Sequence, residues 1–316
     1  MPAVGSIRVA LALLIPMHGA VLFAGFFAPY DYAEQHRDYP YAPPTRIHFK
    51  PLPYVYGLTG DYQEDPTRVY ALRFFAGGRF FGTDPPGHVF LLGTDGYGRD
   101  ILSRVLYGGR ISLATGLVAT AWALAIGLIW GVTAGFFGGW LDGVMMRGAE
   151  LFLALPWLYL LLAVRAFLPL HISPVQAFLL LVAIIGSVGW VRPARLVRGL
   201  TLSLVERPYV EAARAFGGRP LYLIRRHILP ETKGLLLTQA TILIPYYILA
   251  EVTLTFLGLG VGEPVPSWGG MLAEARQYHS LVAHLWMLTP GAATFLTLLG
   301  YVHLAEVLQD SRDPIR

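Results

Sequence analysis

Long apolar runs alternate with shorter polar stretches along this chain of 316 residues. Apolar runs near the roughly 20 residues that an α-helix needs to cross a bilayer predict transmembrane helices. The pattern therefore predicts an all-α polytopic membrane protein. We expect six transmembrane helices, at residues 7–28, 111–137, 151–169, 175–191, about 235–258 and about 284–308.

Residues 29–92 break this pattern, because they are rich in proline, tyrosine and charge. Val69–Phe75 and His88–Leu92 hold β-branched and aromatic residues between turn formers, a composition typical of short strands. We predict a small, partly β extracytoplasmic insertion after residues 1–28, which hold the N-terminal tail and the first helix. The alternative that the first apolar run is a cleaved signal peptide is disfavoured, because no small-residue cleavage site with a soluble domain follows.

Residues 93–110 come between the insertion and a predicted core at 111–316. Their pattern suits an amphipathic helix that lies in the membrane interface and leads into the next span. The three glycines of residues 93–100 suggest a phosphate loop, but the chain has no Gly-x-x-x-x-Gly-Lys-Ser/Thr motif, which argues against nucleotide binding. The predicted stripe has apolar Ile101, Leu102, Val105 and Leu106 opposite polar Arg99, Ser103 and Arg104.

A basic loop at about 192–234 sets the predicted topology. It carries nine arginines and lysines between the fourth and fifth predicted helices. Short loops with an excess of Lys and Arg stay in the cytoplasm. Together with the four crossings before this loop, the charge bias places both the N-terminus and the C-terminus in the cytoplasm.

Two short helices are predicted inside this loop. Pro208 suits the first turn of a helix, and Gly217-Gly218 suits the position just past its end. Pro220 starts a second helix, and we expect Pro230 to end the motif. Two helices that meet at a glycine form an elbow with a small apolar knob and a carboxylate, a shape suited to a groove on another protein. On the first helix Tyr209, Ala213 and Phe216 share one face, and Glu211 and Arg214 lie elsewhere on the turn.

Three stretches resemble one protein family, the permease subunits of ABC importers. Glu211-Ala212-Ala213, followed by Gly217 and Ile228-Leu229-Pro230, resembles the EAA loop of these subunits. Pro264–Ala273 resembles their Pro-Ser-Trp-Gly stretch. The resemblance to dipeptide and oligopeptide permeases of the DppC/OppC type is more specific. It rests on a motif formed by Gly93, Thr94, Asp95, Gly98, Arg99 and Asp100.

This resemblance implies the C-type permease subunit of an ABC importer for dipeptides or oligopeptides in a bacterial inner membrane. It implies a heterodimer with a B-type permease subunit, two cytoplasmic ATPases and an extracytoplasmic substrate-binding protein. ATP and Mg²⁺ are expected on the ATPases, with no cofactor on this chain. Nickel complexes and oligosaccharides are alternative cargoes. The coupling residues implied are Tyr209, Glu211, Ala212, Ala213, Arg214, Phe216, Gly217, Ile228, Leu229 and Pro230.

Two further residues are candidates for a pathway or gate. Glu251 lies in the fifth predicted helix, where a carboxylate costs roughly 2.5–3.5 kcal/mol on insertion scales. It either lines a pore and meets a cationic group of a substrate, or takes part in an interhelical hydrogen bond; we favour the second interpretation. Trp268 either anchors the chain at the membrane interface or belongs to an outer gate or a docking surface for the binding protein.

Other function classes find less support. The absence of cysteine excludes disulfides, thiol chemistry and cysteine metal sites. The nine histidines show no convincing metal spacing and no Ser-His-Asp pattern is present, so we predict no catalysis and no metal site. The net charge of +4 does not indicate nucleic acid, because the arginines flank membrane helices. A stand-alone secondary transporter would need paired intramembrane charges or an inverted repeat; a membrane anchor or scaffold is a third alternative.

Overall fold

The computed structural model describes residues 2–310, except residue 76, most of 155–172, and 277–282. The chain divides into two compact units. The first unit comprises Met1–Ala10, Thr115–Ala250 and Tyr301–Arg316, and the second comprises Leu11–Ala114 and Glu251–Gly300. The third predicted membrane helix, at 151–169, lies mostly outside the described residues.

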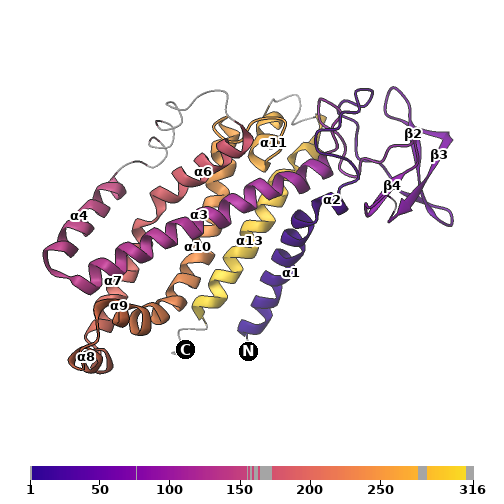
Figure 1. The fold of residues 1–316 in the computed structure, drawn as a ribbon. Coiled ribbons are helices and arrows are strands. Elements are labelled where there is room, and N and C mark those ends of the chain that lie inside the picture. The colour runs from indigo at the N-terminus through magenta and orange to yellow at the C-terminus, as the bar shows by residue number, and fades with distance from the viewer. Residues whose placement is uncertain are drawn as a thin grey trace. The chain divides into compact units, whose positions relative to one another are not determined.

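The second unit holds an antiparallel sheet of four strands in the order β1-β2-β3-β4 (Figure 1). Its core contains the buried side chains of Val55, Leu72, Phe81 and Val89. The prediction of a partly β insertion is therefore confirmed. The strands are β1 (His48–Phe49), β2 (Pro53–Leu58), β3 (Glu64–Phe74) and β4 (Phe81–Thr83).

The two predicted strand segments of the insertion have different outcomes. Most of Val69–Phe75 lies in β3, as expected. His88–Leu92 is not a strand. Its backbone donors bind side chains rather than a neighbouring strand: the N–H of Val89 donates to the Tyr30 hydroxyl, and the N–H of Phe90 donates to Thr45 Oγ1. Apolar, β-branched residues here fill the core beside the sheet instead of extending it.

The long helix α3 (Ile101–Phe137) corrects two predictions. It runs without a break through residue 110, so no separate interfacial helix precedes the second span. Ser103 and Arg104, expected on a polar outer face, are 0% and 1% exposed. The amphipathic pattern was misleading, because these polar side chains bind carboxylates of the second unit rather than water.

The remaining helices of the chain include one between the second and third predicted membrane helices. Residues 141–150 lie within α4 (Gly139–Ala154), which begins after Phe137 through two glycines with positive φ. Glycine reverses the chain there without a loop, and Asp142 occupies the first turn, where a carboxylate favours the helix dipole. The others are α1 (Pro2–Leu22), α2 (Ala24–Phe27), α6 (Pro174–Gly189), α7 (Val191–Val205), α8 (Pro208–Ala215), α9 (Pro220–Leu223), α10 (Leu229–Phe256), α11 (Trp268–Ala275) and α13 (Thr289–Asp310).

Three helices within the described residues are long and apolar enough to cross a membrane: Ile101–Phe137, Pro220–Phe256 and Leu285–Gln309. The pair α6 and α7, bent by 46°, adds a fourth if it counts as one broken span. A shorter apolar helix covers Ile7–Leu22. The mostly helical membrane fold is thus evident, with three or four of the expected spans.

Glycines at every fourth position of α3 bring its backbone against α7 in the first unit. A Cβ on Gly127 would lie 3.0 Å from the carbonyl oxygen of Trp190, and a Cβ on Gly131 would lie 2.5 Å from that of Ala194. A Cβ on Gly135 would lie 2.8 Å from the carbonyl oxygen of residue 198. Small residues at this spacing allow two helices to approach closely, so α3 fixes the position of α7.

Candidate functional site

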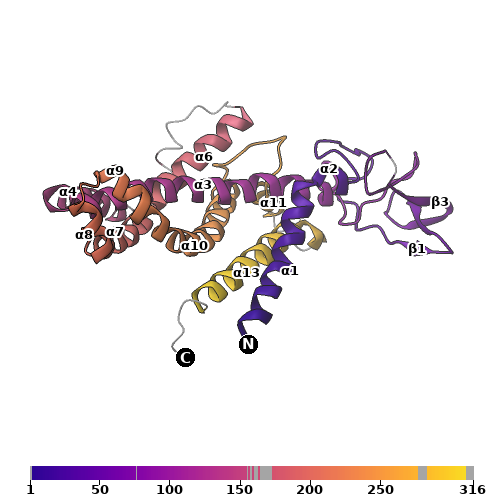
Figure 2. The same ribbon diagram turned by 60° about the horizontal axis from the view of Figure 1, so that its bottom comes forward.

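The predicted elbow is present in the first unit, where α8 follows α7 and precedes α9 (Figures 1 and 2). Pro208 is the first residue of α8, as predicted. Gly217 has a φ of +85°, its N–H donates to the Arg214 carbonyl, and the N–H of Gly218 donates to the Ala213 carbonyl. This pair of hydrogen bonds is the Schellman arrangement, in which a left-handed glycine ends a helix. The turn therefore has a defined shape.

The second half of the elbow differs from the prediction. Pro220 starts α9, but Pro230 does not end the motif, because the helix continues into α10 through a π-helical turn at Ile224–Ile228. A π-turn widens the helix and redirects its hydrogen bonds. Here the N–H of Leu229 donates to the Ile224 carbonyl just before the proline, so the proline ring is accommodated at the start of α10.

The elbow exposes a group of large side chains to solvent. Phe216 is 92% exposed, Leu221 60%, Tyr222 55% and Tyr209 43%. Glu211, Ala212 and Arg214 are exposed as well. An aromatic residue is rarely left so open without a partner, and a patch of such residues typically marks a protein interaction site. We call the side chains of Tyr209, Glu211, Ala212, Phe216, Leu221 and Tyr222 the elbow surface.

Buried residues hold this surface onto the rest of the first unit. Ile228 packs with Val132, Val197 and Leu204, all of them 5% exposed or less. The guanidinium of Arg214 lies 5.9 Å from the ring centroid of Phe136 on α3. The elbow is therefore attached to both α7 and α3, although its outer side chains have no cover.

An ion pair joins α4 to α7 next to this attachment. Arg198 donates from Nε and Nη2 to the two carboxylate oxygens of Asp142, each at 2.5 Å. The hydrogen bonds from Arg198 lower the pKa of Asp142. Such two-pronged pairs fix orientation as well as distance. Sequence reasoning missed this pair, because the two residues are 56 positions apart.

The Gly93–Asp100 motif lies in the second unit, in front of α3. Thr94 and Asp100 form a short antiparallel bridge. The carboxylate of Asp95 accepts hydrogen bonds from the backbone N–H of Tyr97 and of Arg99, at 2.8 and 3.0 Å. Gly98 has a φ of +72°, and a Cβ there would lie 2.0 Å from the carbonyl oxygen of residue 36. The motif is thus a tight buried turn that requires glycine.

Two arginines connect this turn to a distant part of the second unit. Arg99 binds Asp95 at 2.6 Å, Glu263 at 2.6 Å and Glu274 at 3.0 Å. Arg104 binds Glu263 at 2.8 Å and Glu274 at 3.2 Å. The arginine side chains are only 6% and 1% exposed. Sequence reasoning missed both glutamates, since they lie more than 150 positions from their partners. We call these five residues the buried charge cluster after its two buried arginines; the Glu263 side chain is 51% exposed at its edge.

Burial changes the titration of acids at this cluster. Burial raises the pKa of Asp100 to about 7, against the effect of hydrogen bonds from Ser103. Burial and the adjacent Glu263 raise the pKa of Glu274 to about 7. Burial opposes ionisation of Glu263 too, but hydrogen bonds from Glu274 and Arg104 lower its pKa to about 2. The two glutamates therefore share one proton near neutral pH.

Glu251 is fully buried in the second unit. Its Oε1 accepts a hydrogen bond from Thr255 at 2.9 Å, and the hydroxyl groups of Ser112 and Ser267 also lie beside the carboxyl. Ser112 belongs to α3, whereas Glu251 belongs to α10. This placement agrees with an interhelical hydrogen bond, the interpretation we favoured, because a pore-lining acid would be open to water.

Trp268 does not anchor the chain at the membrane interface, because its side chain is 0% exposed. Its indole N–H donates to the carbonyl of Val105 at 2.9 Å, and its backbone N–H donates to the Ser112 hydroxyl at 3.2 Å. Trp268 therefore packs α11 against α3 inside the second unit. The Pro-Ser-Trp-Gly stretch thus packs on α3, the helix that follows the Gly93–Asp100 motif.

Comparison with known proteins identifies the family. The profile of the binding-protein-dependent transport system inner membrane component matches residues 127–314, which include the whole elbow. This chain belongs to that family. The resemblance seen in the sequence is confirmed, and membership in this inner membrane component family also establishes a membrane transport protein with several helices.

Relatives of this chain include permease proteins of peptide transport systems. The dipeptide transport system permease protein DppC of Bacillus subtilis is 36% identical over 73% of this chain and 70% of that protein. The glutathione transport system permease protein GsiD of Pectobacterium atrosepticum is 38% identical over 72% and 74%. The oligopeptide permease OppC of Bacillus subtilis is 36% identical over 73% of each chain. A chain of the MetNI methionine ABC transporter aligns over 65% of this chain and 95% of that chain at 20% identity, with a TM-score of 0.46.

Proposed function

We propose that this chain is the permease subunit of an ATP-driven importer for dipeptides or oligopeptides. Family membership supports a transport role, and the relatives' names support a peptide cargo over nickel complexes or oligosaccharides. In this proposal the chain crosses a bacterial inner membrane six times, with both termini in the cytoplasm and the β-rich insertion outside. It provides half of the pathway and pairs with a B-type permease subunit. An extracytoplasmic binding protein delivers the cargo.

The elbow surface is proposed to dock into a cleft on one of two cytoplasmic ATPases. The single observation that carries this step is the exposure of Phe216 at a rigid turn whose inner residues are buried. Glu211 would pair with a basic residue of the ATPase, and Ala212 would permit close approach. ATP and Mg²⁺ would bind to the ATPases, so this chain would hydrolyse nothing itself.

A lever mechanism follows from the attachments of the elbow. Closure of the ATPases around ATP draws the elbows of the two permease subunits together. In this chain, the close contact of α3 with α7 and the Asp142–Arg198 pair make the elbow and these helices move together. The movement opens the pathway to the outside, and separation of the ATPases after hydrolysis reverses it.

Charge reversal on the elbow surface tests this proposal. We expect Glu211→Arg to insert normally but to lose ATP-driven peptide uptake in vesicles that contain all subunits. Gly217→Trp should act similarly, because a bulky residue disfavours a φ of +85° even though the space around Gly217 is open. Glu206→Arg is the matched control, since Glu206 is exposed just outside α8. Uptake at the wild-type rate by both elbow variants would contradict the lever role.

A further inference from the structure

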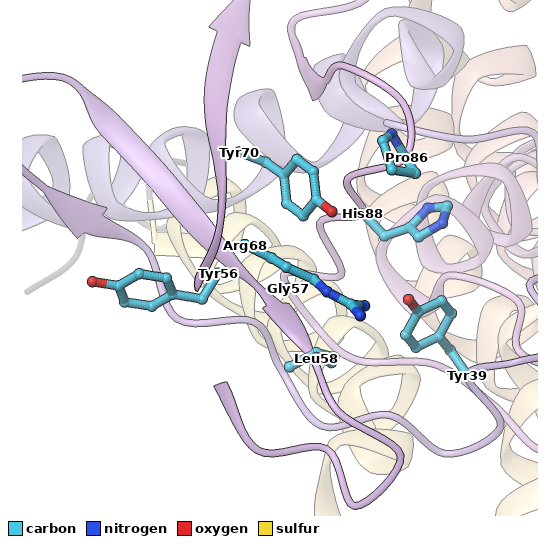
Figure 3. Close-up of a pocket in the computed structure, with 8 residues that line it drawn as sticks. All are labelled: Tyr39, Tyr56, Gly57, Leu58, Arg68, Tyr70, Pro86 and His88. Carbon is cyan, nitrogen blue, oxygen red and sulfur yellow. The ribbon is translucent and has the colours of Figure 1, made fainter. Parts of the chain in front are cut away.

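A pocket in the second unit lies outside everything described so far. It has a volume of about 110 Å³ and opens beside the sheet between β2, β3 and the segment before α3 (Figure 3). Figure 3 shows the Arg68 guanidinium, the Tyr39 and Tyr70 hydroxyls and the His88 ring around one space, whereas the Tyr56 ring points away. The lining consists of Tyr39, Tyr56, Gly57, Leu58, Arg68, Tyr70, Pro86 and His88.

A bulge in the sheet sets the position of Arg68. Tyr56 pairs with Val69, but the next residue of β2, Gly57, pairs with Asp65, so residues 66–68 have no partner on β2. Bulges of this kind redirect side chains and often lie beside functional sites. A Cβ on Gly57 would lie 2.9 Å from the Cβ of Arg68, so only glycine leaves room for the arginine to cross β2 here.

A second glycine makes room for the Tyr70 ring. A Cβ on Gly87 would lie 2.5 Å from Cγ of Tyr70 and 2.9 Å from its Cδ1. The ring therefore rests directly on the backbone, and its hydroxyl is directed into the pocket (Figure 3). Two of the polar side chains in the lining thus depend on two separate glycines, which indicates a built site rather than a chance gap.

The charges around the pocket favour an anion. The Nε of Arg68 lies 3.3 Å from Asp65, whose carboxylate is held by the hydroxyl of Thr67 at 2.6 Å and its N–H at 3.0 Å. This pairing leaves the far end of the guanidinium turned toward the pocket (Figure 3). Burial lowers the pKa of His88, so its imidazole is neutral near pH 7. The described lining contains one cation and no acid.

The donors of the pocket match one chemical group. A guanidinium fork with nearby phenol hydroxyls is suited to two-pronged binding of a carboxylate. The volume is smaller than the roughly 150 Å³ cavity that accommodates benzene in an engineered protein. It therefore fits a carboxylate with one or two carbons, while the rest of the ligand remains outside. Leu58 and Pro86 offer apolar contacts to those carbons.

We propose that this pocket binds a carboxylate group, presented either as the terminal carboxylate of a peptide or as an acidic side chain. Arg68 is the principal binding residue, and the hydroxyls of Tyr39 and Tyr70 complete the site. The proposal is independent of the elbow and of ATP-driven uptake, because binding is measured on this chain without its partners.

The test uses the full chain in lipid nanodiscs and ligand-observed NMR titrations with three probes. N-Acetylglycine carries a terminal carboxylate, N-acetylaspartate α-methylamide carries only a side-chain carboxylate, and N-acetylglycinamide carries none. We expect at least one carboxylate probe to bind and the neutral amide not to bind. The tighter of the two carboxylate probes identifies whether a terminal or a side-chain carboxylate is the preferred source.

Arginine variants on one strand provide the control. Arg68→Gln should weaken carboxylate binding by about fivefold, as expected for the loss of a charge pair whose arginine is 64% exposed. Arg73→Gln removes a charge of similar exposure from β3, where it pairs with Asp84, and should leave binding unchanged. The proposal would be overturned if neither carboxylate bound, or if the neutral amide bound as tightly as the carboxylates. Equal carboxylate binding by the two arginine variants would overturn it as well.

Discussion

The elbow and the buried charge cluster use similar residues in opposite ways. Both include a glycine turn with positive φ, at Gly217 and at Gly98, and both carry arginines and glutamates. In the elbow the charged and aromatic side chains face solvent. In the charge cluster the arginines Arg99 and Arg104 are almost completely buried and each binds more than one carboxylate.

This difference separates a surface for a partner from an internal support. A buried arginine must be paired, because an uncompensated charge in the interior is costly. The exposed ring of Phe216 contributes little to the stability of this chain alone. It can therefore contact an incoming protein. Substitutions in the charge cluster should therefore affect folding, whereas substitutions in the elbow surface should affect function with little effect on folding.

The largest expected effect comes from removing a buried arginine. Arg104→Met should lower the free energy of unfolding by about 1.5–3 kcal/mol, because Glu263 and Glu274 each lose a charge-assisted hydrogen bond and keep only Arg99 as a cationic partner. Denaturant unfolding in detergent measures the change. Arg225→Met, at an exposed position next to the elbow, is the control and should stay within about 0.5 kcal/mol of wild type. Equal free energies of unfolding for the two variants would contradict the proposed contrast between a structural charge cluster and an elbow that contributes little to stability.

The charge cluster and the adjacent Asp100 should also make the free energy of unfolding depend on pH, which the elbow should not. Asp100 and Glu274 have pKa values near 7 in the folded chain, above the values of 3.8 and 4.5 for free carboxyls. The folded state therefore holds more protons than the unfolded state between about pH 4.5 and 7, so stability should fall as pH rises through 7. Glu263 stays ionised in this window.

Unfolding measured at intervals from pH 5 to pH 8 tests this slope. Glu274→Gln should flatten it, because the variant has no proton to lose at this position. Glu211→Gln, on the elbow surface, should leave the slope unchanged. A stability that rises with pH over this range, or a Glu274→Gln slope equal to that of wild type, would show that burial does not control these acids.

Substitutions in the Asp142–Arg198 pair should have a smaller effect on stability but a clear effect on the coupling of ATP hydrolysis to uptake. Asp142→Arg or Arg198→Asp should each cost about 1 kcal/mol, since the pair is partly exposed, and should reduce ATP-driven uptake. The double exchange restores the opposite charges and should recover both properties in large part. Failure of the double variant to recover uptake above the single variants would argue against a role for this pair in transmitting movement.

The smallest effect on stability is expected at the tip of the elbow. Phe216→Ala should change the free energy of unfolding by less than about 0.5 kcal/mol, because the side chain is 92% exposed. In the proposed importer it should nevertheless weaken co-purification of the ATPase. Loss of stability comparable to that of Arg104→Met would mean that the ring is structural.

Local signals in the sequence predicted the elbow, whereas the sequence did not predict the long-range contacts. Pro208 and Gly217 mark the first elbow helix because proline and glycine act on the backbone of their own turn. Pro230 was misjudged, because a π-turn that no residue pattern announces accommodates its ring. Residues 141–150 lie between two predicted membrane helices, and no helix was predicted there, yet they belong to α4. Counting charged residues does not reveal that Asp142 lies in the first turn of a helix, where a carboxylate is favourable.

The charge cluster shows why other parts could not be predicted. Arg99 and Arg104 were placed on the polar face of an interfacial helix, which is where isolated arginines belong. Their partners Glu263 and Glu274 lie far along the chain, and a single sequence carries no signal for such a pairing. The same limit applies to Arg68, whose position depends on a shift in register between two strands.

The most direct test of the central claim uses the absence of cysteine from this chain. Ala215→Cys introduces a single thiol at an exposed position of the elbow and leaves the neighbouring Phe216 ring in place. A membrane-impermeant maleimide should label it in inside-out vesicles but not in intact spheroplasts, and bound ATPase subunits should protect it. Labelling of spheroplasts from the outside would contradict the account, as would labelling of inside-out vesicles that the ATPases leave unchanged.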